Sequence, residues 1–172
     1  PRKKEWREGT IFDFWASLYA DDGGLLFCAR DDITDGSNQT FSTLEKFGLR
    51  MHVSGKTEAM YVPWDVRTYS QADTSNISVA NGFVPFTELF RYLGFLIHYS
   101  LSDELDVDHR ISAAGAAFGS LSCILCARRT SYTRKGQIYQ VLVQSILLYG
   151  SECWALSAAL LRKLISFHSK CV

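Results

Sequence analysis

Two adjacent carboxylates, Asp21 and Asp22, are the residues of this chain whose type and spacing most directly suggest chemistry. Like charges this close together are costly unless a cation lies beside them. Mg²⁺ suits such a position, because it takes one or two carboxylates together with substrate phosphates. A pair of such ions assists phosphoryl or nucleotidyl transfer by holding the attacking and leaving oxygens. The alternative is a solvated acidic turn that binds nothing.

The elements expected around this pair are strands and one helix. Short apolar runs on both sides of the acidic, glycine-containing turn predict a β-hairpin. A helix is predicted from Asp32 to Phe47, with Phe41, Leu44 and Phe47 at helical spacing and Gly48 as the left-handed residue that ends it. Further strands are predicted at 49–53, 58–62, 77–79, 83–84 and 90–97.

The second half of the chain has the apolar spacing of helices. A first stripe consists of Ile111, Ala114, Phe118, Leu121 and Leu125. A second helix, begun by Thr133 as its N-cap and ended by Gly150, is expected to bury Ile138, Val141, Leu142, Ser145 and Leu148. A third, begun by Ser157, is expected to bury Leu160, Leu161, Leu164, Phe167 and Cys171.

These patterns predict an α+β fold in two parts. Residues 1–100 are expected to form antiparallel hairpins with one helix, and residues 101–172 a helical region. Hydropathy patterning favours a soluble chain without a membrane partner, since no apolar run reaches the roughly 18 residues that a span needs. The N-terminal residues do not resemble a signal peptide, so we expect an intracellular protein that is not secreted.

The formal net charge of zero conceals an asymmetry along the chain. Residues 109–172 carry eight Lys or Arg against one acid, whereas residues 11–108 carry six against fifteen. A basic half could follow a nucleic-acid backbone, although chance clustering on solvated faces would give the same count. The basic residues closest together are Arg128, Arg129, Arg134 and Lys135.

The cysteines offer a different hypothesis, a zinc site. Cys123 and Cys126, with His168 and Cys171, have the residue types of a zinc ligand set. Cys123 and Cys126 also lie in an apolar, helix-periodic run, where a free cysteine is usually a small core residue. A small zinc-dependent interaction module is therefore a third alternative.

Several motifs in order resemble the reverse transcriptases of non-LTR retrotransposons. The stretch 18–22, Leu-Tyr-Ala-Asp-Asp, is similar to the catalytic hairpin of that family, and 47–58 to the motif that carries a Lys-Thr-Glu strand. Residues 90–94, Phe-Arg-Tyr-Leu-Gly, are similar to the hairpin that grips the primer end. The resemblance continues through 110–118, 147–154 and 167–171, so that it covers nearly the whole chain.

The resemblance implies a function and residue roles. The chain would be the C-terminal palm and thumb of an RNA-directed DNA polymerase, with an RNA template, a DNA primer, deoxynucleotide triphosphates and Mg²⁺, acting in the nucleus or cytoplasm. Asp21 and Asp22 would bind metal, and Lys56 would lie near the triphosphate. The residues implied at the primer end are Tyr19, Phe90, Tyr92, Leu93 and Gly94, while the basic helices would hold the template–primer backbone.

The chain departs from the family pattern in three places. His52 stands where the family has Asn, and Gly23-Gly24 replaces at least one larger apolar residue after the paired acids. The strand with the family's first catalytic aspartate, together with the fingers, is expected upstream of this sequence. We therefore expect the chain to be inactive by itself. The alternative is a degenerate, non-catalytic remnant that at most binds nucleic acid through its basic helices.

Overall fold

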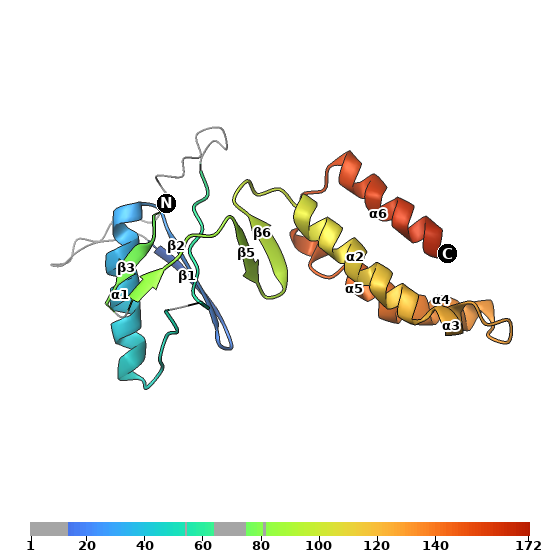
Figure 1. Ribbon diagram of the computed structural model, residues 1–172, viewed down its shortest axis with the longest axis horizontal. Coiled ribbons are helices and arrows are strands. Elements are labelled where there is room, and N and C mark those ends of the chain that lie inside the picture. Colours follow the sequence, from blue (N-terminus) through green and yellow to red (C-terminus); the bar gives the residue numbers. More distant parts are fainter. Residues whose placement is uncertain (1–13, 54, 64–74, 81) are drawn as a thin grey trace. The chain divides into compact units, whose positions relative to one another are not determined.

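The computed structural model describes residues 14–53, 55–63, 75–80 and 82–172. The chain divides into two compact units, Pro1–Leu93 and Gly94–Val172, each described here by itself; the sequence placed this boundary near residue 100. The fold is α+β, and the described residues form three separate two-stranded sheets, with helices gathered mainly in the second unit (Figure 1). Within the described residues, no helix is both long and apolar enough to cross a bilayer.

The first hairpin forms as the sequence predicts. Strand β1 (Phe14–Tyr19) pairs antiparallel with β2 (Asp22–Phe27), and the register places Tyr19 opposite Asp22. Ala20 and Asp21 make the turn, with Ala20 at φ 52°. A non-glycine residue in this left-handed region is uncommon and costs about 1–2 kcal/mol. The turn is thus tight and its tip carries the carboxylates.

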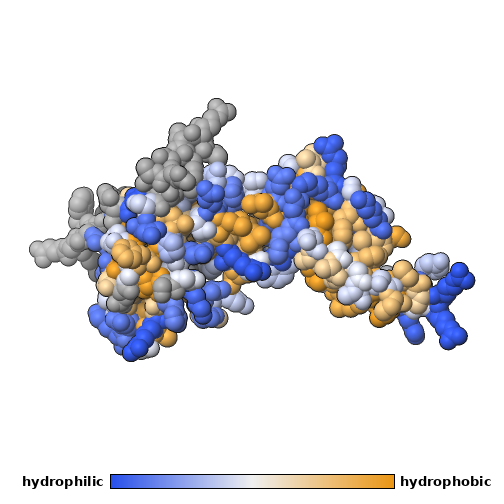
Figure 2. Space-filling model, viewed as in Figure 1, coloured by the Kyte–Doolittle hydropathy of each residue, from blue (hydrophilic) through white to orange (hydrophobic). Residues whose placement is uncertain are grey.

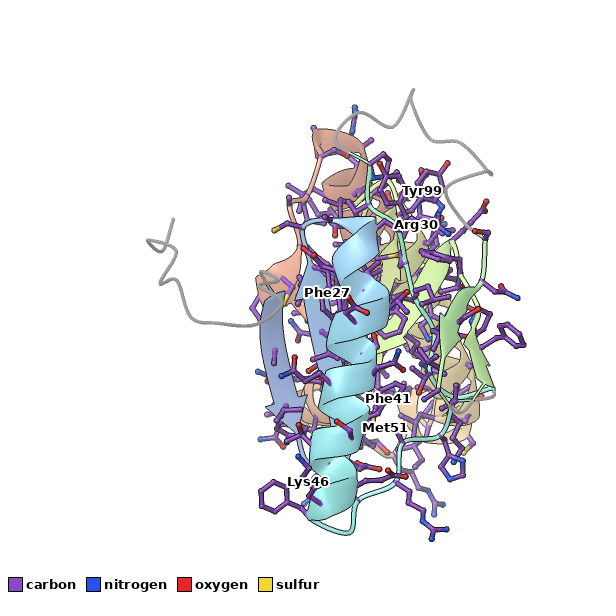
Figure 3. The ribbon with its side chains drawn as sticks, turned by 90° about the vertical axis from the view of Figure 1, so that its left-hand side faces the viewer. Phe27, Arg30, Phe41, Lys46, Met51 and Tyr99 are labelled. Atoms are coloured by element: carbon purple, nitrogen blue, oxygen red, sulfur yellow. The ribbon has the colours of Figure 1, made fainter. Side chains whose placement is uncertain are left out.

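Helix α1 (Arg30–Lys46) joins two hairpins (Figure 3). It packs against β2 and against β3 (Ile77–Val79), which pairs with β4 (Gly82–Val84). The core of the first unit forms here, from Phe41, Val53, Ile77, Val79 and Val84. Gly48, at φ 77°, ends the helix as predicted. Phe47 is 77% exposed, because it is the C-cap residue and leaves the helical face at φ −94° and ψ 7°.

The strands predicted at 49–53 and 58–62 are not formed. The described part of this stretch is irregular, with a single parallel bridge between Ala59 and Phe86. Ala59 donates its N–H to Pro85 O and accepts from Thr87 N. A strand is stabilised by a ladder of such pairs, and one bridge does not extend into one. The apolar composition of these segments instead places Val53 in the core.

The strand predicted at 90–97 is a hairpin. Strands β5 (Leu89–Tyr92) and β6 (Phe95–His98) form a two-stranded sheet, and the boundary between the units falls in the turn that joins them. Leu93 and Gly94 have φ of 49° and 80°. Positive φ at both central residues is the conformation that tight hairpin turns favour, so the Leu-Gly pair reverses the chain.

The second unit is built around α2 (Glu104–Ser120), which packs on β6 and on the helices that follow. The short α3 (Ser122–Leu125) continues from it. After a turn come α4 (Tyr132–Tyr139), the π-helical turn η3 (Gln140–Gln144) and α5 (Ser145–Leu147). The 3-10 turn η4 (Ser151–Cys153) leads to α6 (Ala158–Cys171). Their core consists of Val107, Ala114, Tyr139, Val143, Leu147, Leu160 and Leu164.

The prediction for the middle helix was wrong in its start and its inner face. Ser131, not Thr133, is the N-cap, since its side chain accepts from Arg134 N. Val141 is 66% exposed, while Tyr139, Val143 and Leu147 are buried. The buried row runs through these three residues at intervals of four, and Val141 lies about 200° around the helix from Tyr139, on the outer face.

Three single-residue predictions in the second unit have clear outcomes. Ser157 caps α6 by accepting from Leu160 N, as predicted. Gly150 is left-handed at φ 78° and follows α5, also as predicted. Leu161, expected to be inward, is 47% exposed, because the buried row of α6 passes through Leu160 and Leu164.

Candidate functional site

The tip of the β1–β2 hairpin places Asp21 and Asp22 in solvent. Asp21 lies in the turn and Asp22 is the first residue of β2, and both side chains are exposed. Leu18 and Tyr19, at the end of β1, are also exposed, by 74% and 66%. Two exposed, adjacent carboxylates fit a hard cation that keeps most of its water or substrate ligands, as Mg²⁺ does.

The aromatic ring of Tyr92 contacts one face of this hairpin. Residues directly opposite in an antiparallel pair point to the same face, so Ser17, Gly24, Tyr19 and Asp22 share a face. The hydroxyl of Tyr92 lies 3.1 Å from Ser17 Oγ. Two ring carbons of Tyr92 lie 3.9 Å from the position a Cβ would take at Gly24. The ring therefore lies against the Ser17–Gly24 pair, next to the pair that carries Asp22.

Three other residues implied at the primer end lie in the same segment as Tyr92, on β5 and in the turn that follows it. Phe90 is half-buried and stacks nearly parallel to Tyr92, with ring centroids 6.4 Å apart. Leu93 is 38% exposed in the turn, and Gly94 follows it as the first residue of the second unit. The structure thus brings Tyr92 to the carboxylate hairpin, with Phe90 stacked behind it.

Lys56 is exposed but is not joined to the carboxylate pair. It follows Gly55, which is at φ 83°, in an irregular bend rather than on the predicted strand. Thr57 Oγ1 donates to His52 O at 2.5 Å and closes this bend. Among the described residues, no hydrogen bond or ion pair links Lys56 to Asp21 or Asp22.

The four clustered basic residues gather where α3 and α4 meet, and we call this group the basic tip. Arg128 and Arg129 lie in the connecting turn, and Arg134 and Lys135 in the first turns of α4. The three arginines are exposed, and Lys135 Nζ lies 5.6 Å from the ring centroid of Tyr132. Figure 2 shows hydrophilic side chains gathered at this end of the helical unit. Cations beside a helix N-terminus reinforce its positive potential and favour an anionic ligand.

The proposed zinc ligands are not brought together. Cys123 and Cys126 are exposed on and after α3, while His168 and Cys171 lie on α6. Within the described part of the chain, no three His, Cys, Asp or Glu side chains are arranged to hold a metal ion. His168 Nδ1 instead lies 2.8 Å from the hydroxyl of Tyr139. Burial raises the pKa of Tyr139 and of Cys171, so these side chains belong to the packing of the helical unit.

Sequence reasoning missed a buried polar group centred on Asp106, which is fully buried on α2. Its Oδ1 accepts from Leu96 N at 3.1 Å, and its Oδ2 accepts from Trp154 Nε1 at 2.9 Å. Arg110 Nε lies 3.7 Å from Oδ1 of Asp106, and Arg110 Nη2 donates to Gly94 O. The sequence does contain a pattern that indicates this group, because Asp106 and Arg110 precede the buried Ala114 at successive intervals of four residues and so lie on the same helix face.

Two sequence motifs meet at this polar group. The guanidinium of Arg110 lies 4.5 Å from the ring centroid of Tyr149. A Cβ at Gly94 would be 3.6 Å from Tyr149 Cε1, and one at Gly150 would be 3.0 Å from Phe95 Cδ2. The segment around 149–154 is therefore fixed against the start of β6.

Comparison of the chain with protein-family models, curated proteins and solved structures finds no match.

Proposed function

We propose that this chain is the palm and thumb part of an RNA-directed DNA polymerase of the retroelement type. The observation that carries the proposal is the contact of Tyr92 with the carboxylate hairpin, 3.1 Å from Ser17 Oγ. It lies on the face of the hairpin that also carries Tyr19 and Asp22. Two segments that resemble the catalytic and primer-binding motifs of one family are thus adjacent in the fold of the first unit.

The chemistry proposed for this site is nucleotidyl transfer. Asp21 and Asp22 would hold Mg²⁺, which would supply charge neutralisation for the attacking and leaving oxygens. Their exposure at the hairpin tip leaves space for the phosphates of a deoxynucleotide triphosphate, to which Lys56 would contribute positive charge. Tyr19 and Tyr92 would line the primer end, since aromatic rings provide stacking surfaces for bases.

The basic tip is proposed to hold the backbone of the RNA template and DNA primer. Its three arginines are exposed, and its four cations lie within one short segment of the helical unit. Contacts of this kind are independent of base sequence and weaken with salt. Binding through this group alone is the second candidate function, that of a non-catalytic nucleic-acid-binding remnant. It is favoured by the lack of a third carboxylate beside Asp21 and Asp22 in the described residues.

The proposal is tested by cleaving bound nucleic acid with radicals that are generated at the proposed metal site. The chain is bound to a DNA primer annealed to an RNA template, and Fe²⁺ replaces Mg²⁺ in the presence of ascorbate and peroxide. Hydroxyl radicals formed at the bound ion cut only nearby backbone. Cleavage of the hybrid is expected to centre on the primer 3′ end and to disappear in the double variant Asp21→Asn/Asp22→Asn.

The matched control is Asp35→Asn, which removes one exposed carboxylate from α1 and is expected to leave the cleavage pattern unchanged. Cleavage that is uniform along the hybrid, or that persists in the double variant, would contradict a metal site at the hairpin. If the hybrid binds but is not cut near its 3′ end, the remnant function is the better account.

A further inference from the structure

Tyr149 is a half-exposed aromatic residue beside the turn that ends the proposed primer-binding segment. It follows α5 and is 51% exposed. Its ring lies 3.6 Å from the position a Cβ would take at Gly94, which is ordinary van der Waals distance, so the ring lies directly against the turn. Glycine is favoured at position 94 by its φ of 80°.

The ring is held in this place by a cation with a fixed position. The guanidinium of Arg110 lies 4.5 Å from the centroid of Tyr149 and donates to Gly94 O. Arg110 is only 8% exposed and pairs with Asp106, which accepts from Leu96 N and Trp154 Nε1. Arg110 therefore contacts Tyr149 and Gly94 at once, and Asp106 restrains Arg110.

The backbone next to Tyr149 is equally restrained. Gly150 is left-handed at φ 78°, and a Cβ there would lie 3.0 Å from Phe95 Cδ2. The chain thus passes Phe95 so closely that the main chain after Tyr149 has little freedom. An exposed ring on a restrained backbone loses little conformational entropy on binding, which favours its use as a contact surface.

We propose that Tyr149 is a further nucleic-acid-binding residue whose exposed ring stacks on a base of the primer strand, and that Arg110 positions it. This inference rests on the proposed function, because that function places the primer end at the segment 90–94. Base–aromatic stacking tolerates any base, since each has a π face, as a polymerase primer site requires. Arg110 is buried and acts through Tyr149, so it is a positioning residue.

Photo-crosslinking tests the inference with the full chain. A primer that ends in 5-iodo-2′-deoxyuridine is annealed to an RNA template, bound and irradiated, and the joined peptide is identified by mass spectrometry. The crosslink is expected at Tyr149. Tyr149→Phe is expected to retain it, and Tyr149→Leu to lose it and to weaken hybrid binding about tenfold. Phe83→Leu, which removes a 63% exposed ring on β4, is the matched control and should retain the crosslink to Tyr149.

Arg110→Lys distinguishes positioning from general destabilisation. It keeps the charge but not the planar group over the ring, and is expected to lower the yield at Tyr149 while leaving the salt dependence of binding unchanged. Crosslinks confined to other residues, with unchanged affinity in Tyr149→Leu, would overturn the inference. If iron cleavage at the primer 3′ end persisted in that case, the proposed function would stand without Tyr149. If the wild-type chain gave no cleavage at the primer end, that result would contradict the proposed function itself, whatever the crosslinking showed.

Discussion

The indole Nε1 of Trp154 donates to the carboxylate Oδ2 of Asp106 at 2.9 Å, across 48 residues of sequence. The same carboxylate accepts from Leu96 N and pairs with Arg110. One buried acid therefore links the start of β6, the helix α2 and the segment after α5. A buried charge is tolerated only where such partners satisfy it, so all three segments must be in place for Asp106 to be stable.

Replacing Asp106 is predicted to destabilise the helical unit strongly. Asp106→Ala leaves Arg110 buried without its partner and two donors unsatisfied, with an expected loss of about 3–5 kcal/mol in the free energy of unfolding. Urea unfolding followed by circular dichroism measures it. Asp108→Ala is the matched control two residues away, because Asp108 is exposed and bonds only to the solvent-exposed Lys163. Similar losses in both variants would contradict the role assigned to Asp106.

Two glycines of the second unit are predicted to respond to alanine in opposite directions. Gly150→Ala requires a left-handed alanine with its Cβ 3.0 Å from Phe95 Cδ2, which should cost about 1–3 kcal/mol. A Cβ at Gly119, near the end of α2, meets nothing within 4 Å. Gly119→Ala should therefore stabilise the helix by about 0.5–1 kcal/mol. Thermal unfolding of both variants checks the sign of each effect.

The features that sequence reasoning located correctly depend on neighbouring residues. The hairpin at Asp21, the helix end at Gly48 and the cap at Ser157 follow from local chemistry, namely turn reversal, positive φ and a hydroxyl that accepts a backbone N–H. Such interactions need no information about distant parts of the chain. The zinc hypothesis failed for the opposite reason, because residue types alone do not bring α3 and α6 together.

The features that were missed depend on partners distant in sequence. The segments at 49–53 and 58–62 have strand composition, but their described residues find only one bridging partner, Phe86. Val143 and not Val141 is buried in an almost continuously apolar stretch, because the buried row begins at Tyr139 and Val141 lies about 200° around the helix from it. Asp106 was not identified from the sequence, because its partners Leu96 and Trp154 are recognised only in the folded unit.

Stability is predicted to fall at alkaline pH through Tyr139. Burial first, and then the neighbouring Cys171 thiolate, raises the pKa of Tyr139 above its ordinary value. The folded state therefore keeps the phenol proton to a higher pH than the unfolded state does. The contribution of Tyr139 to the free energy of unfolding should be constant below the ordinary pKa of about 10 and should be lost as the pH rises through the folded-state value.

Urea unfolding at several pH values between about 8 and 11 measures this dependence. Tyr139→Phe should flatten the decline, since the titrating group is absent, although it also loses the bond to His168. Tyr132→Phe is the control, because that ring is 91% exposed. An equally steep decline in Tyr139→Phe would assign the alkaline loss to other groups.

Primer extension by this chain alone is predicted to be absent with either Mg²⁺ or Mn²⁺. Two-metal nucleotidyl transfer uses carboxylates that hold both ions, and no third acidic, His or Cys side chain joins Asp21 and Asp22 among the described residues. A primed RNA template with labelled deoxynucleotides provides the assay. Template-dependent extension that is abolished by Asp21→Asn would show that the chain carries a complete site.

Nucleic-acid binding through the basic tip is predicted to depend steeply on salt. Each phosphate neutralised by Lys or Arg contributes about −0.9 to the slope of log K against log[salt] for duplex DNA. Neutralising the tip with Arg128→Gln, Arg129→Gln, Arg134→Gln and Lys135→Gln together should reduce the magnitude of the slope by up to about 3.6 and weaken binding at low salt. Fluorescence anisotropy of a labelled hybrid across a salt series measures both quantities.

The control for this series is Arg162→Gln/Lys170→Gln, which removes two cations from α6 without touching the basic tip. Its slope should stay close to that of the wild-type chain, because charges outside the contact release few counterions. Equal changes in the two sets of variants would mean that the whole basic surface attracts the hybrid without a defined contact. A reduction confined to the tip variants would place the backbone contact where α3 and α4 meet.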